Sequence, residues 1–320
     1  MATPPPEIMM TIIRSLTVDT LPNAYTFPLE VKATLHSLAL VSYSCHEWST
    51  PLLYGHVTVS QSQITKLRAT LSSATPRAST LAKRIHTLRL TAPYKNSYIQ
   101  NHDLYNWAKC DMDVAEAAAV LHLLAPHATL RRLFMDMALT CQSLYRPYPS
   151  SESFNLQNAI SSLTSLSDLV LGNLEETVNH FYWMIELDEH PYNCLSALET
   201  VTILDVNVVH APTRGIFRQL TNVKEMVLIR PWMTVPELGG EVLAELFGPN
   251  RVLQSLTIIL ASGWDIMPLQ SLRFEDLGPA MVPYRDKVLI LPESEEQKKL
   301  FVWKMIRDKI GTGHRWDQQV

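Results

Sequence analysis

Residues 85–90 read Ile-His-Thr-Leu-Arg-Leu, with apolar side chains at the first, fourth and sixth positions. The same spacing recurs five more times along the chain. The fourth and sixth positions are two residues apart, so they share one face of a short β-strand. The first position lies three residues earlier, where we expect a turn that leads into the strand. The other copies are Leu130-Leu133-Met135, Leu166-Leu169-Leu171, Leu198-Val201-Ile203, Val223-Met226-Leu228 and Leu253-Leu256-Ile258.

One short strand cannot bury its apolar face alone, whereas stacked copies bury theirs against one another. The copies therefore predict a solenoid, although their separation of 25 to 45 residues is looser than in a regular leucine-rich repeat. Further strands are expected at 56–59 and 288–291. Helical periods fill the connections at 113–124, 156–163, 177–187, 213–220 and 237–247. Strands that alternate with helices pair in parallel, so we expect an α/β solenoid with parallel strands inside and helices outside.

Composition restricts the class of protein further. The chain has 320 residues, 47% hydrophobic and 18% charged, which is typical of a folded globular protein. We find no apolar run that approaches the ~18–20 residues of a membrane helix, so no membrane partner is expected. The four cysteines are scattered without a C-x-x-C pair. This indicates a reducing intracellular compartment, cytoplasmic or nuclear.

The net charge of −4 is unevenly distributed. Residues 1–100 carry +5 and residues 101–320 carry −9. The basic residues between Lys66 and Lys95 have two interpretations: a solvated helix face, or a patch for an acidic partner surface. Nucleic acid is disfavoured as a partner, because the rest of the chain is acidic and no recognised binding motif accompanies the basic residues.

The N-terminal sequence predicts helices at 4–16 and 29–48, the second either bent or divided in two. The order of motifs here resembles an F-box. More narrowly, it is similar to the fungal F-box proteins whose C-terminal part is an irregular leucine-rich repeat. The residues that carry the resemblance are Pro5-Pro6-Glu7-Ile8, Ile12 and Leu16, Leu38-Ala39-Leu40-Val41, Cys45 and Trp48, Pro51-Leu52-Leu53-Tyr54, and His56-Val57-Thr58-Val59.

The resemblance implies a three-helix module at residues 1–60 that docks on the Skp-type adaptor of a ubiquitin ligase and, through it, on a cullin. Residues 61–84 would be a linker helix, 85–292 the solenoid that holds a protein target, and 293–320 a capping helix and tail. The chain would then be a non-catalytic receptor that raises the local concentration of its target. The adaptor contacts implied by matching position are Pro5, Pro6, Glu7, Ile8, Ile12, Leu16, Leu38, Leu40, Val41 and Trp48.

The strand residues that alternate with the buried positions should face the concave side of the solenoid. Several of them are apolar, so two interpretations stay open. Either this face is covered, as in a sheet buried on both sides, or it is a partner-binding patch. The target-binding residues predicted on this face are Arg89, Arg132, Phe134, Asp136, Val170, Thr202, Leu204, Val227, Ile229 and Thr257.

Motifs of catalysis are missing from the sequence. It contains no H-E-x-x-H, G-x-S-x-G or Gly-rich phosphate loop, and its histidines and cysteines lack metal-ligand spacing. We therefore expect no cofactor, no metal and no enzyme activity. The dense acidic and histidine cluster at 175–190 is best explained by a helix with one solvated and one aromatic face. The alternative for this cluster is an acid/base or metal site. For the whole chain, the alternative to a ligase receptor is a solenoid scaffold that does not recruit a ligase.

Overall fold

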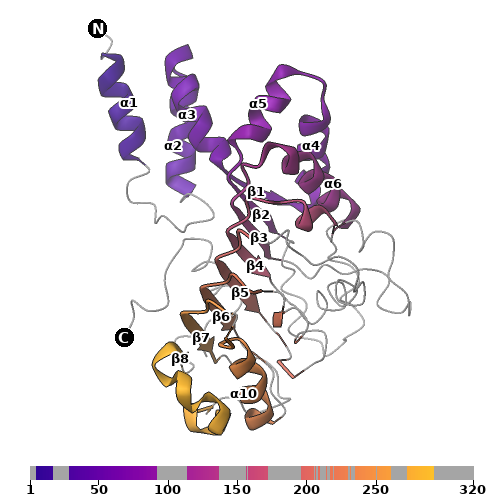
Figure 1. The fold of residues 1–320 in the computed structure, drawn as a ribbon. Helices are drawn as coiled ribbons and strands as arrows, with labels where there is room; N and C mark the ends of the chain where they lie inside the picture. The colour runs from indigo at the N-terminus through magenta and orange to yellow at the C-terminus, as the bar shows by residue number, and fades with distance from the viewer. Residues whose placement is uncertain are drawn as a thin grey trace, which may run out of the picture.

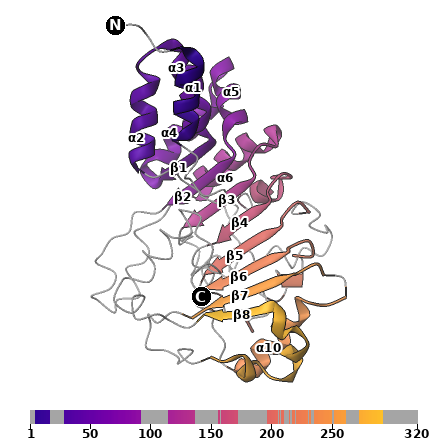
Figure 2. The ribbon, with the colours of Figure 1, turned by 90° about the vertical axis from the view of Figure 1, so that its left-hand side faces the viewer.

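Eight parallel strands form one sheet whose spatial order, β1 to β8, follows the order of the sequence (Figures 1 and 2). Each strand hydrogen-bonds only to its neighbours in sequence, so every connection advances the chain by one position. This is the open α/β solenoid that the repeat predicts, and the predicted fold class is confirmed. The strands are β1 (His56–Ser60), β2 (Thr87–Thr91), β3 (Arg132–Asp136), β4 (Asp168–Leu171), β5 (Thr200–Leu204), β6 (Glu225–Ile229), β7 (Ser255–Ile259) and β8 (Val288–Leu291).

The computed structural model describes only part of the chain. The described residues are 5–16, 29–91, 114–136, 156, 158–171, 196–204, 206, 208–209, 214, 217–218, 220–229, 231, 235–249, 251–260 and 272–291. The helix expected at 177–187 and the capping helix and tail expected at 293–320 lie outside them, as does the acidic and histidine cluster at 175–190.

The repeat spacing sets the register of the sheet. The fourth and sixth positions of the six copies align across it in two continuous rows, which β1 and β8 extend. Both rows belong to one buried core cluster, to which Val57, Val288 and Ile290 add half-buried side chains at the two ends. Side chains of one face are therefore stacked in register along the whole solenoid. The rows are Val57, Leu88, Leu133, Leu169, Val201, Met226, Leu256 and Val288, and Val59, Leu90, Met135, Leu171, Ile203, Leu228, Ile258 and Ile290.

The turns before the strands form a backbone ladder of their own. The first apolar position of each copy is buried, and the residue after it hydrogen-bonds to its equivalent in the preceding copy. For example, the Ser167 N–H donates to the Arg131 carbonyl at 2.8 Å, and the Glu199 N–H donates to the Ser167 carbonyl at 2.8 Å. The ladder continues through Lys224 and Gln254 at the same distance. It aligns the starts of the strands and satisfies backbone groups that the turns would otherwise leave unpaired.

Helices cover the core-facing side of the sheet at its two ends. They contribute buried residues such as Ile64, Leu121 and Leu243 to the same core cluster. Residues 61–84, expected as a linker helix, form two helices that pack in this core. The covering elements are α4 (Gln61–Ser72), α5 (Pro76–Arg84), α6 (Val114–Leu124), η3 (Ala125–His127), α10 (Pro236–Glu245), η7 (Phe274–Leu277) and η8 (Pro279–Lys287).

Three N-terminal helices pack together around a small core of Ile13, Leu35 and Cys45. They are α1 (Pro6–Ser15), α2 (Leu29–Ala39) and α3 (Tyr43–Gly55). The segment 29–48 is thus divided between two helices, and the second one runs on to Gly55. Because α3 ends at Gly55 and β1 begins at His56, the helices join the sheet with no linker. The sheet therefore begins inside the range 1–60 that the sequence assigns to the helical module, rather than at residue 85.

Candidate functional site

Helix α1 presents apolar side chains to solvent. Ile8 is 51% exposed and Ile12 is 44% exposed, while Ile13 is buried in the small core. Ile8 and Ile12 are four residues apart, so they form one stripe on the outer side of the helix. Proline at the start and Glu7 in the first turn suit the N-terminus of a helix, because proline has no N–H to leave unpaired and the carboxylate faces the positive end of the dipole.

The turn between α2 and α3 is more exposed still. Leu40 is 88% exposed, Val41 is 68% exposed and Tyr43 is 80% exposed. The turn is held by Ser42, whose hydroxyl accepts a hydrogen bond from the Cys45 N–H at 3.2 Å and so caps α3. A short turn with a capped helix start therefore holds three large apolar or aromatic side chains at the surface, where they are exposed to solvent.

The elements that carry these exposed residues meet at one end of the helical bundle. Figures 1 and 2 both show the start of α1 beside the α2–α3 turn, at the end farther from the sheet. We call this set the free-end surface and define it as Ile8, Ile12, Leu40, Val41 and Tyr43. Exposed apolar side chains gathered on one face are typical of a protein interface.

The predicted adaptor residues divide into two groups. Pro5, Glu7, Ile8, Ile12, Leu40 and Val41 are exposed. Leu16, Leu38 and Trp48 are half-buried against the small core of the bundle, so they support the surface rather than form it. Nothing is described of the Pro6 side chain. The sequence prediction omitted Tyr43, although its position after a serine cap at a helix start would have placed it beside Val41.

The predicted target-binding residues lie on the face of the sheet opposite the main core, which we call the concave face as the repeat predicts, and most of those described are buried. Arg89, Phe134, Val170, Thr202 and Ile229 are buried, although they face away from the main core cluster. Arg132, Val227 and Thr257 are half-buried, and the side chains of Asp136 and Leu204 lie outside the described part of the chain. The covered alternative thus fits the centre of this face better than an open patch does.

Two contacts organise the concave face at its N-terminal end. The Arg89 guanidinium lies over the Phe134 ring, 4.7 Å from the ring centroid. The Arg132 Nε donates to the Asp168 Oδ2 at 3.2 Å across neighbouring strands. Both pairs are directly opposed in the strand register, so the sheet itself sets their geometry.

Positive groups from α2 and from the first strands lie close together. Burial is the main cause that lowers the pKa of His56 to about 4, and the positive charges of Arg132, His86 and Lys32 contribute the rest. Burial and the Arg89 guanidinium lower the pKa of Lys32, which belongs to α2. Helix α2 is therefore electrostatically coupled to β1–β3, and the helical module is not independent of the solenoid.

The described residues offer little for catalysis or metal binding. Within them, no group of three or more histidine, cysteine or acidic side chains could hold a metal ion. Among the described helices, none is long and apolar enough to cross a membrane.

Comparison with models of known protein families and with curated proteins finds no match for this chain.

Proposed function

We propose that the chain is the substrate-recognition subunit of a Skp–cullin–F-box type ubiquitin ligase. The free-end surface would dock the Skp-type adaptor, and the solenoid would hold a protein target. The observation that carries the proposal is the free-end surface itself: five large apolar or aromatic residues exposed at one end of a three-helix bundle. The F-box resemblance places the adaptor contacts at four of these five positions.

The proposed mechanism is positioning. A receptor that binds adaptor and target together raises the local concentration of target lysines near the catalytic partners of the ligase. The direct junction of α3 with β1 supports this role, because a short and rigid connection limits the volume that a bound target can explore. No bond chemistry is required of the chain itself.

Burial against an adaptor would stabilise the complex through the exposed apolar area. Fully burying a Leu, Ile or Val side chain contributes about 1.5–3 kcal/mol. With Leu40 at 88% exposed and Ile8 at 51%, the expected contributions are about 2 and about 1 kcal/mol respectively. We therefore expect Leu40 in the α2–α3 turn to contribute more to adaptor affinity than Ile8 in α1.

The test is a binding measurement between the full-length chain and a purified Skp-type adaptor, by isothermal titration calorimetry. Val41→Asp and Ile8→Asp should each weaken binding at least about tenfold, because a carboxylate would lose its water at an apolar interface. Val282→Asp is the matched control: Val282 is an exposed valine, 63% accessible, in η8 at the other end of the solenoid. Its variant should bind as the native chain does.

A folded native chain that does not bind the adaptor would refute the proposal. The alternative is then a solenoid interaction scaffold without ligase recruitment. One sequence observation favours that alternative: between Cys45 and Trp48 the chain carries His46 and Glu47, and the basic residue usual in the F-box family is missing. In that case the free-end surface would serve another partner, whose binding Val41→Asp and Ile8→Asp should weaken and Val282→Asp should leave unchanged.

A further inference from the structure

The solenoid has an open end at β8. This strand is the last in the sheet, with β7 on one side and no further strand on the other among the described residues. Its four residues are all half-buried, whereas their neighbours Ile258 and Ile259 in β7 are buried. An edge strand of this kind exposes backbone donors and acceptors, and natural proteins usually cover such an edge.

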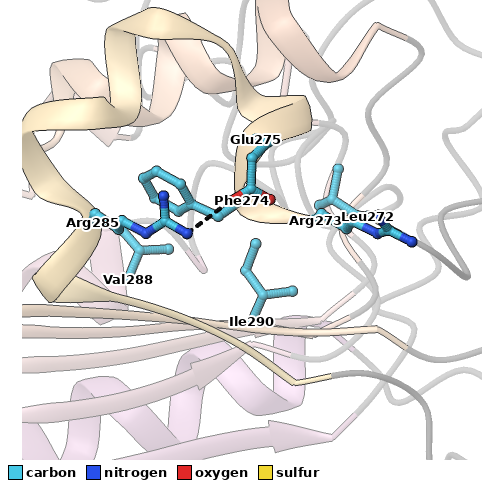
Figure 3. Close-up of a pocket in the computed structure, with 7 residues that line it drawn as sticks. All are labelled: Leu272, Arg273, Phe274, Glu275, Arg285, Val288 and Ile290. Atoms are coloured by element: carbon cyan, nitrogen blue, oxygen red, sulfur yellow. Dashed lines mark hydrogen bonds and ion pairs between the residues drawn. The ribbon is translucent and has the colours of Figure 1, made fainter.

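A pocket of about 390 Å³ opens beside this strand. Its apolar lining comes from Leu272 and Phe274 on one side and from Val288 and Ile290 on the other. Figure 3 shows Val288 and Ile290 directed from the strand toward the helical turns that carry Phe274. Val288 and Ile290 are also the last members of the two core rows, so the pocket lies at the end of the main core that the described residues leave open.

The rim of the pocket is charged. The Arg285 Nη2 donates to the Glu275 Oε1 at 2.7 Å, and the Arg285 guanidinium lies 5.2 Å from the Phe274 ring centroid. Both members of the ion pair are largely exposed, so the pair contributes little and can exchange partners. Arg273 adds a second positive charge, which leaves the rim with one net positive charge.

We propose that this pocket is the binding site for the C-terminal segment of the same chain, residues 295–310. The segment lies outside the described residues, and the argument for it rests on where the chain leaves the sheet. Strand β8 ends at Leu291, beside the pocket, and only residues 292–294 separate it from the segment. Three residues span at most about 10 Å, which holds the segment close to the pocket at high local concentration.

The sequence of the segment complements the pocket. It carries Leu300, Trp303, Ile306 and Ile310 at helical spacing, a stripe that could fill an apolar pocket. The residues nearest the end of β8, at 293, 295 and 296, are acidic and match the net positive rim locally, although the segment as a whole carries five basic residues against three acidic ones. A solenoid also needs a terminal element with a polar outer face, and the charged face of this segment would provide one.

The experiment is amide hydrogen exchange followed by mass spectrometry on the full-length chain. The segment 295–310 should be protected in the native protein. In Ile290→Asp it should exchange at least about tenfold faster, because a carboxylate would replace the floor of the pocket. Leu289→Asp is the matched control, since Leu289 is an equally half-buried neighbour on the opposite face of the same strand. It should leave the segment protected.

Exchange in β6 and β7, read in the same experiment, reports whether the sheet survives each substitution. If Ile290→Asp opens the sheet, Arg285→Glu decides instead, because the Arg285 side chain is largely exposed. Reversing this rim charge should speed exchange of the segment about threefold. Fast exchange in the native chain, or protection that neither variant changes, would overturn the proposal. Protection that rises with protein concentration would also overturn it and assign the pocket to a second copy. None of these outcomes depends on adaptor binding.

Discussion

Gly240 lies where α10 packs against the backbone of η7, and the substitution Gly240→Ala tests that packing. A Cβ at this position would overlap the Leu277 carbonyl oxygen, and it would lie 2.7 Å from the Leu277 carbonyl carbon and 3.1 Å from its Cα. All three atoms belong to the backbone, so no side-chain rotation can make room. Leu277 itself is buried, and Gly278, which follows it, has a φ of 77° that favours glycine.

The expected magnitude follows from two opposing effects. Alanine in place of glycine stabilises a helix interior by about 0.8–1.0 kcal/mol. Overpacking a well-filled interior costs about 1–3 kcal/mol, and more when backbone must move. Here α10 must move away from η7, which loosens the packing of Val242 and Leu243. Because the clash is with backbone, the cost lies at the upper end, about 3 kcal/mol. The helix gain of about 1 kcal/mol offsets part of it, so we expect Gly240→Ala to lower the free energy of unfolding by about 2 kcal/mol.

Gly55→Ala is the matched comparison. Gly55 is also a buried helical glycine, but a Cβ there would meet only the Arg84 carbonyl oxygen at 4.0 Å, an ordinary contact. The helix preference should then act alone and raise stability by up to about 1 kcal/mol. Urea unfolding followed by circular dichroism measures both variants against the native chain. The reasoning fails if Gly240→Ala is as stable as the native chain, or if the two variants change stability in the same direction.

Three further predictions concern the concave face and the helical bundle. Phe134→Ala should cost about 3–5 kcal/mol, because it leaves a cavity and removes the ring under Arg89, and a thermal melt with little shift would contradict this. The pKa of His56 is about 4 in the folded chain and about 6.5 when unfolded, so the unfolded state takes up a proton first and stability falls as the pH drops through this window. We expect about 2 kcal/mol of loss between pH 7 and pH 5 by urea unfolding, and a smaller loss in His56→Gln; equal losses in the two proteins would exclude the histidine. Ser42→Ala removes the hydroxyl that caps α3 and should cost about 1 kcal/mol without changing the sheet, as amide exchange of α3 against that of β5 can show.

The strands were predictable because their signal is local. In a parallel sheet, burial alternates with a period of two residues, so each apolar pair marks its own strand and the residue between them marks the opposite face. The apolar residue three positions before each pair marks the turn, and the residue after it, such as Arg131 or Ser167, takes part in the backbone ladder. Six of the eight strands of the described sheet were expected from this pattern, and β1 and β8 were expected from their own short apolar runs at 56–59 and 288–291.

The surfaces were only partly predictable. Ile12 and Ile13 are both isoleucine, yet one is exposed on α1 and the other is buried, because the packing of α3 selects which side of the helix is covered. Val41 and Leu38 also differ in exposure: Val41 is exposed in the turn after α2, whereas Leu38 is half-buried against the small core. Tyr43 could have been placed beside Val41 from the serine cap at Ser42, but its exposure follows only from the packing of the bundle, which leaves the α2–α3 turn uncovered.

Sequence alone determined that this chain is a parallel α/β solenoid preceded by helices, since that outcome depends on spacings of two and three residues that any stacked repeat must satisfy. Contacts between residues far apart decided the rest. They bring Lys32 beside Arg89, bury Phe134 and Ile229 on the concave face, and press Gly240 against Leu277. The physical reason is that burial is a property of what lies opposite a side chain, and the identity of that neighbour is set only when the repeats and the helical bundle have packed.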